Sequence, residues 1–327
     1  MSQKLVFASA IALVASLAAT PSYATSAINE PLDTPGALSA PWVVSGTVNP
    51  SVVTVAGDAP ENALRLTNTD EGQNGFALFD DPISVAEGID VQFTQAQWGG
   101  TGADGIVFFV KDGSDTDTDP GATGGALGYS PGDNDGDPIL GISGALLGVG
   151  LDGFGNFASE SSDGSGCVSD AFERSPNGGD VNAVTLRGAG QGSAGYCMIA
   201  DSYDVVGDGL SAMVNGYDSR EEAAVVVRVV IDPATIADPR VVVFYDGSEI
   251  FDIPLPEDFD NVATVKIGFS AGTGGSTDNH EIWGLTTASS PNAPLADTGI
   301  ETGVYGLAAA SLMAAGGVAL AVRRRKA

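Results

Sequence analysis

The chain has 327 residues, of which 42 are acidic and 13 are basic, and its formal net charge is −29. A charge of this sign argues against nucleic acid and anionic membrane surfaces as partners. With one histidine and two cysteines in the whole chain, a zinc site or a Cys–His nucleophile is also a poor expectation.

The N-terminus has the pattern of a secretory signal peptide. Lys4 precedes an apolar run over residues 5–19, and small residues lead to Ala24. A basic start, an apolar centre and a small-residue end predict cleavage near Ala24, so that residues 1–24 are removed. Residues 25–41 then form a lead-in rich in Pro, Ala and Ser.

The body of the chain alternates short apolar runs with clusters of Gly, Asp, Asn and Pro, a pattern that predicts strands and turns. The expected strands are Val52–Val55, Ala63–Thr67, Gly75–Phe79, Ile89–Phe93, Ile106–Val110, Ala145–Leu151, Val181–Leu186, Ala224–Ile231, Arg240–Tyr245, Glu249–Ile253, Ala263–Phe269 and Glu281–Thr286.

Helical periodicity is nearly absent from the body; its best example, Asp208–Tyr217, predicts a single short turn of helix at most. Tyr245–Ser248 carries the Asp-Gly signal of a β-hairpin. Many strands without intervening helices predict an all-β fold, a sandwich of two large antiparallel sheets. Residues 42–287 show no internal boundary, so we expect one domain there.

Cys167 and Cys197 lie 30 residues apart in a chain expected to be exported, and we predict a disulfide between them. Two acidic segments are less specific. Asp133–Asp137 resembles the start of a calcium loop but lacks the later Glu that completes an EF-hand. Like Asp112–Asp119, it is interpreted as a solvated loop.

Four glycine-rich segments stand at the ends of expected strands: residues 99–105, 121–129, 148–157 and 269–281. Within the third, Asp152 and Asn156 place a carboxylate and a carboxamide among glycines, which lets the backbone approach a ligand closely. Such an oxygen-rich cluster suits a hard cation or a polyhydroxylated ligand. Alone, the segment also fits a simple turn between strands.

Taken in order, the four segments resemble L-type (legume-like) lectins. The motifs are Ala103–Phe109, Gly124–Gly128, Val149–Asn156 and Gly268–Gly275, and the likeness spans about Trp42 to Thr287. The resemblance implies a concanavalin A-like jelly-roll sandwich that binds glycans and is not an enzyme. Sugar-binding positions carried across are Asp104, Gly124, Gly125, Asn156, Gly274 and Gly275, with Phe154 or Trp98 covering the apolar face of a pyranose.

The resemblance also bears on metals. Legume members hold Ca²⁺ through positions that match Asp152, Phe154 and Asn156. Their downstream Asp has no clean match here, and Asp163 and Glu160 are the nearby candidates. Their transition metal is held by a Glu where this chain has Gly150, so that second metal is not expected. For calcium two alternatives stay open: these residues bind Ca²⁺, or Asp152 accepts hydrogen bonds from backbone amides and fixes the loops without metal.

The C-terminus resembles a Gram-positive cell-wall sorting signal. After a spacer at residues 288–294 come Leu295–Gly299 (Leu-Ala-Asp-Thr-Gly), an apolar stretch at 303–322 long enough to cross a bilayer, and a basic tail at 323–327. The resemblance implies that a sortase cleaves between Thr298 and Gly299 and links the protein to cell-wall peptide; a plain membrane anchor is the alternative. Residues 25–298 hold eight basic and 41 acidic residues, a charge of −33.

These observations predict a secreted, wall-displayed, carbohydrate-binding adhesin. A glycoside hydrolase on the same sandwich is the first alternative, although no Glu-x-Asp-x-x-Glu spacing occurs on any expected strand. A wall protein without a ligand, in which the glycine-rich loops merely turn, is the second.

Overall fold

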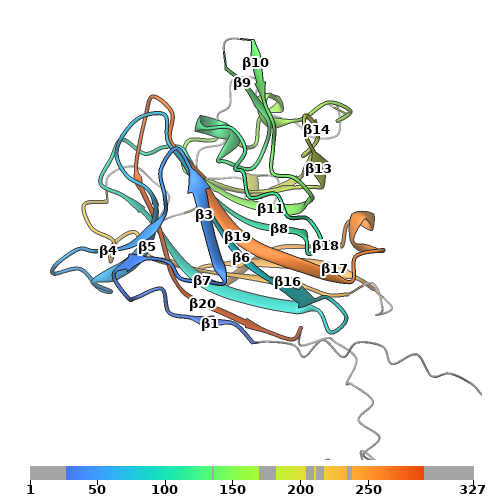
Figure 1. Ribbon diagram of the computed structural model, residues 1–327, viewed down its shortest axis with the longest axis horizontal. Helices are drawn as coiled ribbons and strands as arrows, with labels where there is room; N and C mark the ends of the chain where they lie inside the picture. The colour runs from blue at the N-terminus through green and yellow to red at the C-terminus, as the bar shows by residue number, and fades with distance from the viewer. Residues whose placement is uncertain are drawn as a thin grey trace, which may run out of the picture.

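The computed structural model describes residues 27–134, 136–168, 182–203, 210, 217–233 and 238–290. Two nine-stranded antiparallel sheets pack face to face (Figure 1). Sheet A contains β1 (Asn29–Glu30), β2 (Gly36–Ala37), β4 (Ser51–Thr54), β5 (Asn62–Thr67), β7 (Ile89–Trp98), β16 (Val225–Ile231), β17 (Arg240–Tyr245), β18 (Ser248–Pro254) and β20 (Asn279–Ala288). Its strand order is β18-β17-β16-β7-β20-β5-β4-β2, with β1 beside β20.

Sheet B contains β3 (Trp42–Gly46), β6 (Asn74–Ser84), β8 (Gly105–Asp112), β11 (Ala145–Asp152), β12 (Ala183–Arg187), β13 (Gly190–Gln191), β14 (Ala194–Gly195), β15 (Met198–Asp201) and β19 (Thr264–Gly272). Its main path is β14-β13-β11-β8-β19-β6-β3, with β12 pairing β11 and β15 pairing β12. The described strands pair antiparallel throughout, apart from an isolated parallel bridge between Ser165 and Ala194 of β14.

All twelve predicted runs correspond to strands, and the predicted sandwich is confirmed. Alternation explains why the central strands stay in register. In β16, Val225, Val227 and Val229 are buried between the sheets, whereas Val226 is 42% exposed on the outer face. The Asp-Gly hairpin is also confirmed, because Asp246 and Gly247 both take positive φ angles (49° and 73°) between β17 and β18.

The core has two parts. The larger lies between the sheets and includes Phe93, Phe108 and Phe269, whose rings pack against one another. The smaller, which includes Phe109, Tyr129, Phe157 and Tyr196, lies under the loops that cover sheet B. These loops therefore rest on a hydrophobic layer of their own.

Several expectations need correction. The lead-in is partly structured, since β1 and β2 pair with β20 and β4, and the ordered domain begins before Trp42. The 133–137 segment is no plain loop: β9 (Gly132–Asn134) and β10 (Asp137–Ile139) form a hairpin, seen at the top of Figure 1. Asp133 Oδ1 accepts the Gly136 amide at 2.7 Å and so supports its turn.

The acidic 112–119 segment is anchored rather than free. The ammonium group of Lys111, a fully buried residue, lies 2.7 Å from Asp115 Oδ1 and 2.5 Å from the Asp117 carbonyl oxygen. Lys266 binds the Asp115 carbonyl oxygen at 2.9 Å and Asp80 at 2.7 Å. Two buried cations thus hold the loop against sheet B.

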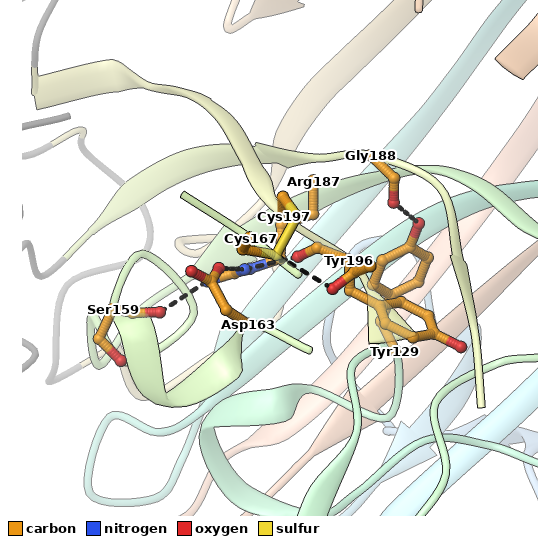
Figure 2. The surroundings of a disulfide bond; sticks show 9 residues. Tyr129, Ser159, Asp163, Cys167, Arg187, Gly188, Tyr196 and Cys197 are labelled. Atoms are coloured by element: carbon orange, nitrogen blue, oxygen red, sulfur yellow. Dashed lines mark hydrogen bonds and ion pairs between the residues drawn. A yellow bond between two sulfur atoms is a disulfide. The ribbon is translucent and has the colours of Figure 1, made fainter. Parts of the chain in front are cut away.

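Cys167 and Cys197 form the predicted disulfide (Figure 2). The predicted signal peptide, sorting motif, apolar stretch and basic tail lie outside the described residues, as does nearly all of the predicted helical turn at 208–217. Within the described part of the chain, no helix has the length and apolar character needed to span a membrane.

Candidate functional site

The predicted site residues converge because three neighbouring strands of sheet B end at one edge. Gly105, the first residue of β8, pairs with Asp152 at the end of β11 on one side. On its other side it pairs with Gly272 at the end of β19. The loops that carry the first, third and fourth glycine-rich motifs therefore meet at this edge.

Asp104 lies at the centre of this edge. Its backbone amide donates to the Gly272 carbonyl oxygen at 3.1 Å, and its own carbonyl oxygen accepts from Gly153 at 2.9 Å. The residue is 4% exposed, and within the described part of the chain its Oδ2 atom has no hydrogen-bond partner. Burial raises the pKa of the Asp104 carboxyl to about 7, while the backbone amide of Gly274 opposes that rise. A buried acceptor without a partner is what a ligand hydroxyl would complete.

Glycines leave room around this carboxylate. A Cβ atom on Gly274 would lie 3.1 Å from Asp104 Oδ2, and one on Gly124 would lie 4.0 Å from the same atom. The Gly124 amide donates to the Thr273 carbonyl oxygen at 3.2 Å, which ties the second and fourth loops together. Larger residues here would close the approach to Asp104.

Asn156 faces Gly125 across the site. A Cβ atom on Gly125 would lie 2.3 Å from the Cβ atom of Asn156, so glycine is required for this contact. The Asn156 carbonyl oxygen accepts from Ser159 Oγ at 2.7 Å and Ser162 Oγ at 3.1 Å. Its side-chain amide is half-buried and makes no hydrogen bond to a described side chain or backbone group. This carboxamide is available to a ligand.

The remaining predicted residues occupy the rim. Gly275 is exposed, and a Cβ atom there would contact nothing within 4 Å. Phe154 is 39% exposed, an unusual position for a phenylalanine, and its ring is the aromatic candidate of the site. Trp98 is engaged elsewhere, because its indole nitrogen donates to Glu281 at 2.8 Å and its ring faces Arg65.

A pocket of about 580 Å³ adjoins these residues and includes Gly125 and Asn156 in its wall. Other polar groups in the wall are Thr47, Asn74 and Ser162, for which the sequence predicted no role, and Asp133, from the segment interpreted as a solvated loop. Asn74 shapes the wall, since it accepts from the Thr47 amide and donates to the Gly121 carbonyl oxygen, each at 2.8 Å. The pocket is therefore mostly polar and carries few charges.

Asp152 is directed inward instead. It is fully buried, and its carboxylate accepts three backbone amides, from Phe154 at 3.1 Å and from Gly155 and Phe157 at 2.7 Å each. Burial raises the pKa of Asp152 to about 7; the three amides oppose this rise and the nearby Asp104 charge adds to it. This is the arrangement expected of an acceptor that fixes the loop.

The proposed calcium ligands do not fit that ion. Calcium takes six to eight oxygen ligands, whereas the Asp152 carboxylate is fully committed to amides and Asp163 is bound by Arg187 at 2.6 Å. Across the described ranges, no three Asp, Glu, His or Cys side chains come together in a way that would hold a metal. We derive no role for calcium from this donor set.

No protein-family model and no curated protein sequence matches the chain. Among solved structures, the Lotus tetragonolobus seed lectin (isoform) is similar, with a TM-score of 0.50 and 14% identity over 82% of this chain and 100% of that one. The Ca²⁺- and mannose-bound VIP36 exoplasmic/lumenal domain (TM-score 0.49, 17% identity, 82% and 91% covered) and the metal-free lectin I-B4 from Griffonia simplicifolia (0.47, 16%, 80% and 98%) are less similar. At these identities the likeness shows the fold, a legume-lectin jelly-roll sandwich.

Proposed function

We propose that the protein binds carbohydrate at the edge of sheet B, between Asp104, Asn156 and the glycines beside them. The observation that carries this proposal is the pair of unsatisfied polar side chains. Among the described residues, Asp104 Oδ2 is buried without a hydrogen-bond partner, and the side-chain amide of Asn156 makes no hydrogen bond. A carboxylate accepts from vicinal hydroxyls, and a carboxamide both donates and accepts. Sugars offer this combination of groups.

The surroundings fit the same ligand. The adjoining pocket is lined by Thr, Ser, Asn and Asp side chains and is large enough for one or two sugar rings to extend into it. Phe154 offers an exposed aromatic surface for the apolar face of a pyranose. Each neutral hydrogen bond contributes about 0.5–1.5 kcal/mol net, so one shallow site binds weakly.

Weak single sites act through multivalent display. We therefore propose a surface protein, exported by its signal peptide and held at the cell wall through Thr298 after sortase cleavage, where it acts as an adhesin. Support for this part comes from the order of the terminal motifs in the sequence alone. Mass spectrometry of protein released from cell walls tests it: a C-terminus at Thr298 linked to wall peptide supports sortase anchoring, and an intact tail contradicts it.

Glycan-array binding by the purified protein, followed by calorimetry with the best glycan, tests the binding site. Asn156→Ala should reduce affinity by about 5- to 100-fold, through loss of one or two hydrogen bonds. Its melting temperature should hardly change, because the Asn156 side-chain amide makes no hydrogen bond to a described residue. Asn261→Ala, at an exposed asparagine, is the matched control and should leave affinity unchanged. Absence of binding to any glycan, with or without Ca²⁺, would overturn the proposal.

A further inference from the structure

The loop that presents Asn156 needs a brace. In the loop that follows β11, the described helical structure is one short 3-10 helix, η2 (Glu160–Ser162). The resemblance of the sequence implies a metal beside this loop, but the residues present do not fit one. Internal contacts brace the loop, and what they mean for Asn156 rests on the proposed carbohydrate site.

Arg187, at the end of β12, is the central group of this brace. It is fully buried, and its guanidinium reaches three separate carbonyl oxygens and one carboxylate. Figure 2 labels Arg187 with three of these partners, Ser159, Asp163 and Tyr196. Nη2 donates to the Ser159 carbonyl oxygen at 2.8 Å, and both Nε and Nη2 donate to that of Phe157. Nη1 donates to the Tyr196 carbonyl oxygen at 2.7 Å and to Asp163 Oδ1 at 2.6 Å. One cation thus binds the Phe157 and Ser159 carbonyl oxygens of the loop and the Tyr196 carbonyl oxygen of a later segment.

Phe157 fills the adjoining space. A Cβ atom on Gly150 would lie 2.2 Å from the Phe157 ring, so the ring occupies the volume into which a side chain at position 150 would project. The guanidinium carbon of Arg187 lies over that ring, 4.9 Å from its centroid. The resemblance implies a metal-binding Glu at position 150, and this chain instead has Gly150 in contact with the Phe157 ring.

The second half of the brace is Asp152. Its carboxylate receives the amides of Phe154, Gly155 and Phe157, the residues on either side of Asn156. Carbonyl oxygens of the loop therefore accept hydrogen bonds from Arg187, and amides of the loop donate hydrogen bonds to Asp152. Cys197 follows Tyr196, whose carbonyl oxygen accepts a hydrogen bond from Arg187. The Cys167–Cys197 disulfide therefore links residue 167 to the strand segment that Arg187 binds (Figure 2).

We propose that Arg187 is the positioning residue that replaces a bound metal, so that Asn156 is held in place and glycan is bound without Ca²⁺. Guanidinium suits this role because its planar fork serves several oxygens at once and it stays charged when buried. Lysine keeps the charge but offers one compact group, so it should not hold Phe157, Ser159 and Tyr196 together.

The first test uses the wild-type protein with Ca²⁺ and with EDTA. Three conditions are compared: 5 mM CaCl₂, no addition and 5 mM EDTA. The melting temperature should vary by no more than 1 °C among them, and the glycan affinity by no more than twofold. A rise of several degrees with Ca²⁺, or loss of glycan binding in EDTA, would overturn the inference. This arm needs no variant and remains decisive even if substitutions at Arg187 prevent folding.

The second test compares Arg187→Lys with Arg240→Lys, a control at a partly exposed ion pair with Asp252. In Arg187→Lys, hydrogen exchange at the Gly155 and Phe157 amides should accelerate at least tenfold and glycan affinity should fall at least tenfold. Added Ca²⁺ should restore neither. Unchanged exchange, or rescue by Ca²⁺, contradicts the role of Arg187.

The two proposals fail separately. Suppose that no glycan binds, that Ca²⁺ leaves the melting temperature unchanged, and that Arg187→Lys accelerates hydrogen exchange in the loop. The carbohydrate function is then wrong, and the bracing role of Arg187 is supported. If glycan binds only with Ca²⁺, the function stands and the brace as a metal substitute is wrong.

Discussion

Asp104→Asn separates what this carboxylate does for binding from what it does for stability. In the folded protein its pKa is about 7, against 3.8 for an unperturbed aspartate, and burial is the main cause. An acid whose folded-state pKa lies above its unfolded value binds more protons when folded. Its contribution to the free energy of unfolding therefore falls as pH rises from about 4 through about 7.

The size of the effect follows from the shift. Each pKa unit corresponds to about 1.4 kcal/mol, so the ionised carboxylate destabilises the fold by about 4 kcal/mol above pH 7 and by about 1.6 kcal/mol at pH 5. Asparagine removes the charge while keeping the shape. We expect Asp104→Asn to be more stable than wild type, by about 3 kcal/mol more at pH 8 than at pH 5.

Urea denaturation at pH 5 and pH 8 measures this difference, and Asp260→Asn, at an exposed side chain, should shift stability by less than about 0.5 kcal/mol at either pH. Glycan affinity should fall about tenfold in Asp104→Asn, because hydrogen bonds to a charged acceptor are about twice as strong as neutral ones. Equal stability gains at the two pH values would refute the reasoning, since the carboxylate would then carry no burial penalty that depends on its charge.

His280 is fully buried, and burial lowers its pKa to about 3; stability should fall by about 2 kcal/mol as pH drops from 6.5 to 4.5, and urea titrations should show that this loss is absent in His280→Gln. Glu281→Gln should cost about 3–5 kcal/mol by leaving its two arginine partners, one of them fully buried, without their counter-charge, whereas Asp252→Asn at a partly exposed pair should cost about 1 kcal/mol or less. Gly150→Ala should destabilise the protein by about 1–3 kcal/mol, measured by thermal melts, because its Cβ would overlap the Phe157 ring. The protein should release no reducing sugar from a glycan that it binds; sustained release would show catalysis.

The strands were predictable because burial leaves a regular trace in the sequence. Alternating apolar residues, as in Val225–Ile231, and turn residues, as in Asp246-Gly247, reflect local rules that need no knowledge of the partner strand. Which strands pair is a different matter. The β11–β8–β19 adjacency that brings Asp152, Gly105 and Gly272 together joins segments far apart in the chain, and the resemblance in motif order, rather than any local pattern, pointed to it.

The rest of the site left no such trace. Asn74 and Asp133 enter the pocket wall from segments whose residue types are ordinary for strand ends and turns. Arg187 ends an apolar strand, and its burial depends on carbonyl oxygens that only the folded loop supplies. Lys111 is similar, since a lysine after Val110 reads as the exposed end of a strand until the acidic loop closes over it. A buried charge that binds backbone carbonyl oxygens cannot be predicted from residue types, because every residue supplies the same carbonyl group.

Two aspartates with raised pKa values at one site are also what a glycoside hydrolase would show. The contacts distinguish the two cases. Hydrolysis needs two carboxyl groups that reach the glycosidic bond from opposite sides. Asp152 reaches no ligand, because it is fully buried and its oxygens hold three amides of its own loop. Asp104 faces the site, whereas Asp133, the described acid in the wall of the adjoining pocket, already accepts the Gly136 amide through Oδ1. Among the described residues, one positioned acceptor opposite a carboxamide therefore fits the proposed binding of a sugar better than its cleavage.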